Sequence, residues 1–176
     1  MRSRMPATNI DIKARYADLR RARQIALRLG AKLAGRDRQV DTYFRVPRGR
    51  LKLRESKLSA SELLPYIRAD RRGPKRSDYE VIRVPSGQRV KAILSRVLGV
   101  RTVVRKTRDI YWLGNVRIHL DRVDGLGTFI EFEAVFDGSP RAERANREKV
   151  RKLLAAFGIA GKDLVKVSYA DMLKDG

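Results

Sequence analysis

The sequence predicts an α+β fold in which an eight-stranded antiparallel β-barrel carries helices packed on its outside. Two observations lead to this prediction: eight short segments alternate apolar and polar residues, as strands do, and tight turns separate them. Eight strands are enough to close a small antiparallel barrel. The 176 residues are enough for one domain with its own core, so we expect a single domain over residues 1–176, with residues 1–8 as a flexible N-terminus.

The strands are marked by their two-residue period. The first, NIDIKAR at residues 9–15, places isoleucine and alanine on one face and asparagine, aspartate, lysine and arginine on the other. The remaining seven are expected at residues 39–46, 49–55, 63–69, 79–84, 103–112, 115–123 and 128–136. The stretches PRG, RRGPKRSD, LGN and DGLG are the turn signals between strands.

Three helices are predicted from apolar residues spaced three and four apart. One covers residues 17–29, a second follows the cap residue Ser86, and a third opens at Ser139 and runs to Phe157. The second helix is expected to bury the apolar face made by Val90, Ile93, Leu94, Val97 and Leu98. A short last turn, SYADML, is expected to pack on the outside of the barrel.

The composition is strongly basic, with 41 Lys and Arg against 20 Asp and Glu, a formal net charge of +21 and a pI near 11.1. Such an excess attracts polyanions, although a solvated surface on a generally basic protein explains it equally well. The chain has no cysteine, which excludes disulfides, thiolate metal sites and cysteine nucleophiles. No apolar run approaches the ~20 residues of a membrane span, and the basic N-terminus MRSRMP is not followed by an apolar signal segment. We therefore expect a cytoplasmic protein without membrane contact.

Several strands carry charged residues on the face opposite their apolar face. If helices cover the apolar faces from outside, the charged faces line the interior of the barrel, and a charged interior implies a charged ligand. The inward cations would be Lys13, Lys52, Arg54, Arg68, Lys106, Arg108 and Arg117. The inward carboxylates would be Asp11, Asp121, Glu131 and Glu133. Cations from several strands can bind successive phosphates, and clustered carboxylates suit Mg²⁺ or Mn²⁺. Salt bridges without a ligand, or solvated outer faces, are the alternatives.

The order of these motifs resembles the CYTH domain family, which includes triphosphate tunnel metalloenzymes, thiamine triphosphatases and class IV adenylyl cyclases. NIDIKAR is similar to the family's E-x-E-x-K signature, and the resemblance continues through QVDTYF, GRLKLRE, RKTRDIYW, RIHLDRVDGLG and FIEFE to SYADML. The run IHLDRVDGLGTFIEFE is most similar to the class IV adenylyl cyclase branch. The resemblance implies an eight-stranded tunnel that binds a triphosphate together with a divalent metal.

The resemblance also assigns roles to residues of this chain. It implies triphosphate contacts from Lys13, Lys52, Arg54, Arg68, Lys106 and Arg108, to which the strand pattern adds Arg117. It implies metal binding by Asp11, Asp121, Glu131 and Glu133, and a catalytic role for Asp11, Lys13 and Glu133. Asn9 and Asp11 replace the first two glutamates of the signature, so the early pair of metal ligands has one charge fewer.

Two enzymatic hypotheses and one other follow. A cyclase would convert ATP to cyclic AMP and pyrophosphate, whereas a triphosphatase would hydrolyse tripolyphosphate or thiamine triphosphate. A non-catalytic module would bind polyphosphate or RNA through charge alone, and incidental polyanion binding is expected in any case. His119, the only histidine, is interpreted either as a group that shuttles a proton or binds substrate, or as a structural residue. Cations crowded in an empty tunnel would repel one another, so their removal is expected to affect stability little.

Overall fold

A computed structural model describes residues 7–68 and 73–173 of the chain. The strands are β1 Ala7–Arg15, β2 Lys32–Phe44, β3 Arg50–Ser56, β4 Glu62–Arg68, β5 Lys75–Tyr79, β6 Ile82–Arg83, β7 Val100–Leu113, β8 Val116–Val123 and β9 Gly127–Phe136. The helices are α1 Leu19–Arg28, α2 Gly87–Leu98, α3 Pro140–Ala156 and α4 Tyr169–Met172, with a 3₁₀ turn at Gly161–Asp163. Among the described residues, no helix is long and apolar enough to cross a membrane.

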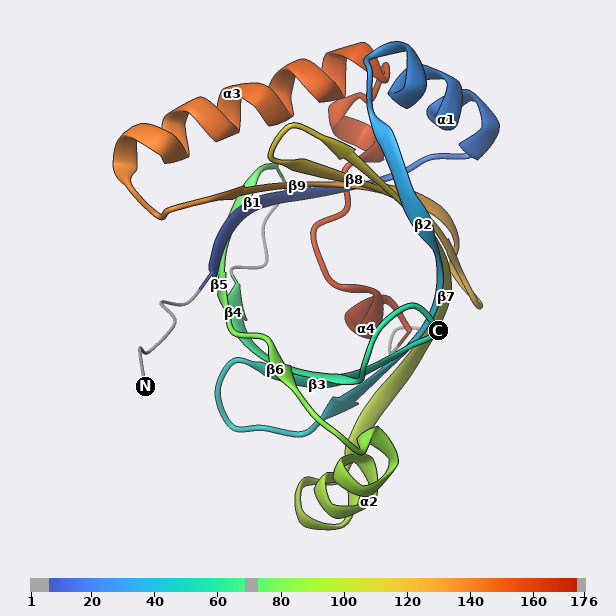
Figure 1. Cartoon of the computed structure of the whole chain (residues 1–176), viewed down its shortest axis with the longest axis vertical. Coiled ribbons are helices and arrows are strands. Elements are labelled where there is room, and N and C mark those ends of the chain that lie inside the picture. Colours follow the sequence, from blue (N-terminus) through green and yellow to red (C-terminus); the bar gives the residue numbers. More distant parts are fainter. Residues whose placement is uncertain (1–6, 69–72, 174–176) are drawn as a thin grey trace.

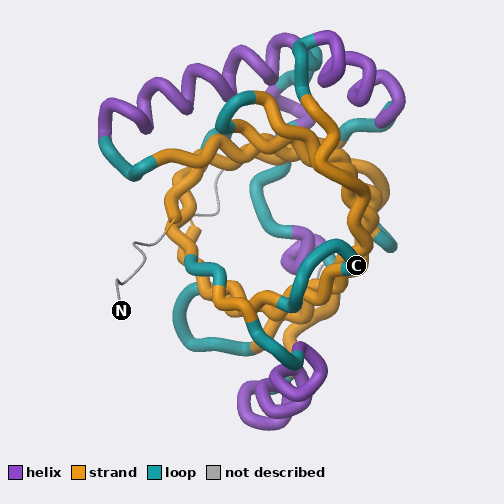
Figure 2. The backbone as a smooth tube through the Cα atoms, in the orientation of Figure 1, coloured by secondary structure: helices purple, strands orange, loops and turns teal. Residues whose placement is uncertain are grey.

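Eight of the strands form a closed antiparallel ring, as the sequence predicts (Figures 1 and 2). The strand order is β3-β2-β7-β8-β9-β1-β5-β4, and pairing of β4 with β3 closes the circle. The two-residue strand β6 adds only a short edge on β4. A closed ring leaves no free edge, and every strand turns alternate side chains toward one interior.

One ring strand comes from a segment that the sequence analysis assigned to a turn. The predicted strand at residues 79–84 is wrong in its position: β5 runs from Lys75 to Tyr79 and so lies mostly within RRGPKRSD, and of the predicted strand only Tyr79, at the end of β5, and Ile82–Arg83 pair with other strands. Lys75 and Ser77 are buried while Arg76 and Asp78 are exposed, which is the strand period expressed with polar residues. The Nζ of Lys75 donates a 2.9 Å hydrogen bond to the carbonyl of Lys166, so this cation anchors the C-terminal segment.

Helices α1 and α3 cover the outer face of β1, β8 and β9, as predicted (Figure 1). The outward residues Ile10, Ile12 and Ala14 of β1 belong to one buried cluster with Val150 and Phe157 on the third-helix side. Each helix begins at a side-chain cap: Asp18 accepts hydrogen bonds from two backbone amides of α1, and Ser139 accepts one from α3. Because the apolar faces point outward to these helices, the polar faces point into the barrel.

Helix α2 differs from the expectation of a buried apolar face. None of its residues is buried, and Ile93 and Val97 are 61% and 73% exposed. The helix stands away from the ring (Figure 1) and makes its main contacts with β2 and β3. Lys91 of this helix forms a 2.6 Å ion pair with Glu55 of β3. The spacing of its apolar residues therefore predicts the helix correctly, but these residues do not form a buried face.

The last turn also differs from its prediction, because α4 packs inside the barrel and not outside it (Figure 2). Tyr169 and Ala170 are buried against the inward-facing Val104, Val123 and Phe129. The Tyr169 hydroxyl donates a 2.7 Å hydrogen bond to the carboxylate of Asp121, a partner that an outside position would not offer. The C-terminal segment consequently ends inside the barrel.

Candidate active site

The interior of the barrel holds a cavity of about 430 Å³ whose wall is built from all eight ring strands and α4. This volume falls in the range of small-molecule sites. Among the described residues, its wall carries six cations and six carboxylates: Lys13, Lys52, Arg54, Lys106, Arg108, Arg117, Asp11, Asp37, Asp41, Glu62, Glu131 and Glu133. The interior is therefore close to neutral, and the net charge of +21 lies elsewhere on the protein.

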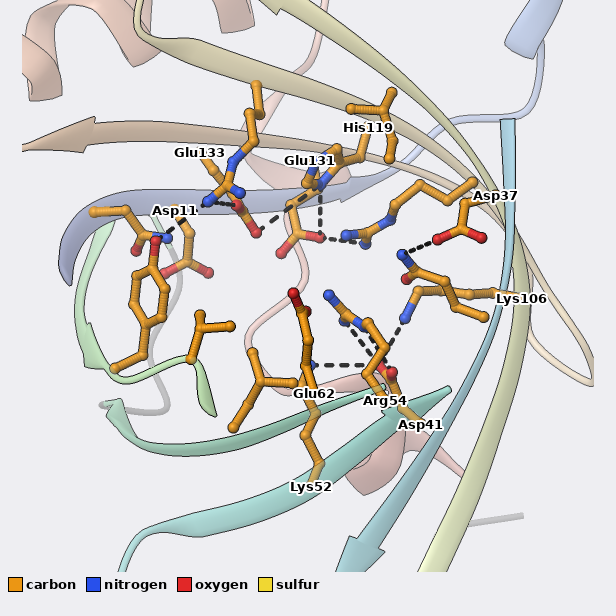
Figure 3. A pocket seen from close by; sticks show the side chains of 18 of the residues that line it. Asp11, Asp37, Asp41, Lys52, Arg54, Glu62, Lys106, His119, Glu131 and Glu133 are labelled. Carbon is orange, nitrogen blue, oxygen red and sulfur yellow. Dashed lines mark hydrogen bonds and ion pairs between the residues drawn. The ribbon is translucent and has the colours of Figure 1, made fainter. Parts of the chain in front are cut away.

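A cationic wall, made by Lys52 and Arg54 of β3 and Lys106 of β7, surrounds the single carboxylate of Asp41 on β2 (Figure 3). Asp41 lies opposite Arg54 in the strand register, and Arg54 donates two hydrogen bonds of 2.8 and 2.9 Å to its two oxygens. The Nζ atoms of Lys106 and Lys52 lie 2.7 and 3.3 Å from Asp41 Oδ2. These contacts fix the three cations on one side of the cavity.

Burial controls the charge of this wall. It lowers the pKa of Lys52 to about 7, with the neighbouring Arg54 adding to the effect, and it lowers the pKa of Lys106 to about 8 against the opposing attraction of Asp41. The pKa of Asp41 is held well below its usual range, because the three cations outweigh the desolvation of the carboxylate. Asp41 therefore stays ionised, while the two lysines titrate near neutral pH.

A carboxylate wall, made by Asp11, His119, Glu131 and Glu133, faces the cavity from β1, β8 and β9 (Figure 3). The strand register pairs Glu133 with Asp11 on one side and with Arg117 on the other, and it pairs Glu131 with Lys13 and His119. Arg117 forms a 2.8 Å ion pair with Glu133, and Lys13 lies 3.6 Å from Glu131. Glu133 thus lies between a carboxylate and a cation, and Glu131 lies between a cation and an imidazole.

Three of these side chains form a group that fits a divalent cation. One ligand atom each from His119, Glu131 and Glu133 lies within 4.8 Å of the others, which is the one such group that the described residues contain. His119 Nδ1 is buried without a hydrogen-bond partner, and it lies 3.7 and 3.9 Å from oxygens of Glu131 and Glu133. Burial and the nearby Arg108 lower the pKa of His119, so its ring is neutral near pH 7. A neutral imidazole beside two carboxylates is a metal-ligand set.

Arg108 lies on β7 two residues beyond Lys106 and contacts the carboxylate wall. It donates two 2.7 Å hydrogen bonds to Asp121 and one of 2.8 Å to Glu131. Asp121 is fully buried, does not reach the cavity wall, and also accepts the Tyr169 hydroxyl. In this structure Asp121 holds Arg108 and the C-terminal segment, and it lies behind the predicted metal group.

The chain of this barrel matches the CYTH domain model over residues 7–169. The chain belongs to the CYTH domain family. A protein of Methanocaldococcus jannaschii named "Putative adenylate cyclase" is 23% identical over 172 residues, covering 93% of this chain and 97% of its own length.

Solved structures of other proteins share the fold. A conserved hypothetical protein of Pyrococcus furiosus superposes with a TM-score of 0.82 at 20% identity, covering 93% of this chain and 98% of that chain. A "putative adenylyl cyclase" of Hippeastrum, described as having a dominant triphosphatase activity, superposes with a TM-score of 0.60 at 17% identity, covering 97% and 96%. At these identities the likeness shows the fold.

The structure brings most of the predicted site residues of this CYTH domain to one cavity. Those that line it are Asp11, Lys13, Lys52, Arg54, Lys106, Arg108, Arg117, Glu131 and Glu133. Asp121 lies behind the wall, and the side chain of Arg68, at the end of β4, lies outside the described part of the chain. Asn9 lines the cavity as well, and its Oδ1 is buried without a hydrogen-bond partner.

Sequence reasoning missed Asp41 and Tyr169 and left His119 undecided. Asp41 has a signal in the sequence, because in QVDTYF it shares the polar face with Gln39 and Tyr43 and alternates with Val40 and Thr42. Tyr169 has no such signal, since the position of α4 inside the barrel depends on long-range contacts.

Proposed function

We propose that this CYTH protein is a divalent-metal-dependent phosphoryl-transfer enzyme that acts on an organic triphosphate, and that it works as a class IV adenylyl cyclase does. In that reaction the ribose 3′-hydroxyl of ATP attacks the α-phosphorus. A new oxygen–phosphorus bond forms, the bond to the bridging oxygen breaks, and pyrophosphate leaves. The observation that carries the proposal is one cavity with a cationic wall facing a carboxylate wall.

The cationic residues would bind the triphosphate. Lys52, Arg54 and Lys106 come from two strands on one side, Lys13 and Arg117 come from the other, and Arg108 lies between them. Charge-assisted hydrogen bonds from several directions orient a phosphate chain and stabilise the charge that moves to the leaving group. We assign this role to the six cations together.

The carboxylate wall would hold Mg²⁺ or Mn²⁺. Glu131 and Glu133 supply the oxygen ligands that these ions prefer, His119 lies within reach, and Asp11 faces the same cavity. When bound there, the cation supplies charge neutralisation at the phosphate and polarisation of the attacking oxygen. Asp11 and Glu133 are the carboxylates that we assign to orient the attacking hydroxyl and accept its proton.

An organic group on the triphosphate is favoured by the apolar part of the cavity wall. Leu58, Val81, Ile110 and Trp112 line the cavity, and none of them offers a charged group to phosphate. Trp112 is 41% exposed, which is the position of a side chain at an opening. A purely inorganic tripolyphosphate would leave these side chains without a partner, whereas a nucleoside would cover them.

Triphosphate hydrolysis is the second candidate. The same residues would serve it, with water in place of the ribose hydroxyl, and the tripolyphosphate or thiamine triphosphate anion would take the place of ATP. The Hippeastrum relative with a dominant triphosphatase activity supports this alternative.

Product analysis tests both candidates. The protein is incubated with ATP, tripolyphosphate or thiamine triphosphate and with Mg²⁺ or Mn²⁺, and cyclic AMP, pyrophosphate and orthophosphate are quantified. Cyclic AMP with an equal amount of pyrophosphate supports the cyclase, and orthophosphate without cyclic AMP supports the triphosphatase. Triphosphate binding that survives chelation of the metal, without turnover, would contradict both and leave a non-catalytic binding module.

A further inference from the structure

Asp41 is a buried charge in the cavity wall for which the proposed reaction has no role, and unlike the equally buried Asp37 it contacts the cationic wall. It is 1% exposed, and it does not belong to the group of side chains that fits a metal ion. It contacts the three residues of the cationic wall, through Arg54 at 2.8 Å, Lys106 at 2.7 Å and Lys52 at 3.3 Å. A carboxylate in the middle of a site for anions calls for a physical reason.

The contacts of Asp41 occupy the hydrogen-bond donors that a phosphate would use. Arg54 gives both Nε and Nη2 to Asp41, so its side-on pair of donors is directed at the carboxylate. Lys106 is 2% exposed at its side chain and gives Asp41 its shortest contact. A phosphate that binds here shares these donors with Asp41 and lies close to a second negative charge, which weakens its attraction.

The two carboxylates of the candidate metal group differ from Asp41. Glu131 pairs with Lys13 and Glu133 pairs with Arg117. A metal ion bound by the two glutamates would replace these cations as their partner, and Lys13 and Arg117 could then bind phosphate. Asp41 has no such substitute, because cations alone are its charged neighbours. Its competition with phosphate therefore persists in the loaded site.

We propose that Asp41 is a positioning residue that fixes Lys52, Arg54 and Lys106 and, by competing with phosphate for them, keeps the pyrophosphate product from binding tightly. The proposal depends on the proposed function, since it concerns the product of the same site. In it, Asp41 lowers the affinity for the product and so allows turnover to continue. A residue that only supported the fold would do the reverse, because its loss would loosen the cations and weaken binding.

The test compares Asp41→Asn with the wild type and with Asp109→Asn. Asp109 is a matched control because it also accepts hydrogen bonds from two arginines, Arg23 and Arg36, but it does not line the cavity. Pyrophosphate is titrated calorimetrically in the presence of Mg²⁺. We expect the dissociation constant of Asp41→Asn to fall by about tenfold, the scale of one charge at close range, while Asp109→Asn binds like the wild type. In steady-state kinetics, kcat and KM should fall together in Asp41→Asn.

Unchanged or weaker pyrophosphate binding by Asp41→Asn would overturn the proposal. If that variant does not fold, Lys106→Met is compared with the double variant Asp41→Asn/Lys106→Met, in which one charge of each sign is removed. The double variant must then bind pyrophosphate more tightly than Lys106→Met, and equal or weaker binding overturns the proposal. A wild type that binds neither tripolyphosphate nor pyrophosphate would contradict the proposed function itself. If the wild type binds both anions, the binding required by the proposed function is present, and the comparison of the variants then tests the role of Asp41 alone.

Discussion

The cationic wall and the carboxylate wall balance their charges in different ways. In the cationic wall, one carboxylate serves three cations, and all four groups are held by direct contacts between 2.7 and 3.3 Å. In the carboxylate wall, Glu131 and Glu133 have their own cations, and the contact of Lys13 with Glu131 is looser at 3.6 Å. The first wall is short of negative charge and the second is not.

This difference indicates which side changes on binding. A phosphate chain brings the negative charge that the cationic wall lacks. Its charge would raise the pKa of the two lysines in that wall, which burial has lowered. A divalent ion would replace cations in the carboxylate wall. Arg108, which contacts Glu131 and lies two residues beyond Lys106 on β7, is placed between the two walls.

The largest effect is expected from Glu133→Gln, which removes one charge from the carboxylate wall and keeps the side-chain volume. Turnover should fall by at least about a hundredfold, because the group that holds the metal loses an ionised ligand. The matched control is Glu143→Gln on α3, where an outer carboxylate pairs with Arg76 and Arg147. Turnover at saturating Mn²⁺ and thermal unfolding measure both variants. Full activity in Glu133→Gln would remove this residue from the metal site.

Arg54→Ala tests the cationic wall. It should weaken tripolyphosphate binding by about 1.5–3 kcal/mol, the range for a hydrogen bond to a charged group. The free energy of unfolding should also fall, by about 1–3 kcal/mol, because Asp41 loses two hydrogen bonds in a buried position. The sequence analysis expected little destabilisation from mutual repulsion, and the internal pairing of this cation with Asp41 corrects that expectation.

The control for Arg54→Ala is Arg36→Ala on the outer surface. Arg36 also donates two hydrogen bonds to one carboxylate, that of Asp109, but its side chain is 62% exposed. Its loss should change the free energy of unfolding by less than about 1 kcal/mol and leave tripolyphosphate affinity unchanged. Calorimetric titration and denaturant unfolding of both variants give the two numbers. Equal effects at the two sites would mean that the cationic wall is not part of the binding site.

The strand period predicted the barrel because side-chain direction in a strand is a local property. NIDIKAR and FIEFE place Asp11, Lys13, Glu131 and Glu133 on the inward faces of neighbouring strands, and no long-range information is needed for that. The same rule failed for β5, because KRSDY alternates buried and exposed residues that are all polar except tyrosine. In this strand the buried and exposed positions cannot be told apart by hydrophobicity.

Long-range packing was beyond the sequence in two places. The apolar period of α2 predicted burial, yet Val97 is 73% exposed, since a helix period does not reveal which surface lies opposite. The position of α4 follows from the hydrogen bond of Tyr169 to Asp121 and from ion pairs of Asp171 with Arg50 and Arg101. These partners lie 48 or more residues away in the chain, so no local pattern announces them.

A smaller effect is expected from Asn9→Glu, which restores the charge that the family signature has at this position. Asn9 lines the cavity two residues before Asp11, on the same face of β1, and its Oδ1 has no partner. An added carboxylate should tighten Mn²⁺ binding without triphosphate by about three- to tenfold, since affinity follows the charge of the ligands. Asn9→Gln has the same length without the charge and should bind Mn²⁺ like the wild type. Identical titrations for all three proteins would mean that Asn9 does not contribute to the metal site.

The smallest signal concerns protons. In the ligand-free protein the pKa of Lys52 is about 7 and that of Lys106 about 8, so both are partly deprotonated at pH 8. A bound triphosphate stabilises the charged lysines and raises both pKa values, so the complex holds more protons than the free protein. Tripolyphosphate binding at pH 8 should therefore take up protons, and affinity should fall as pH rises above about 7, where Lys52 of the free protein loses its proton. Titrations in two buffers of different ionisation enthalpy give the number of protons, which we expect to be up to about 1.4, about 0.9 from Lys52 and about 0.5 from Lys106.

Lys52→Arg should reduce the uptake, because a guanidinium is charged in both states. Lys149→Arg on α3, which lies outside the cavity wall, should leave it unchanged. An uptake that is absent from the wild type, or equal in Lys52→Arg, would show that the cationic wall is already fully charged before the ligand binds, and that the contrast between the two walls is only one of geometry.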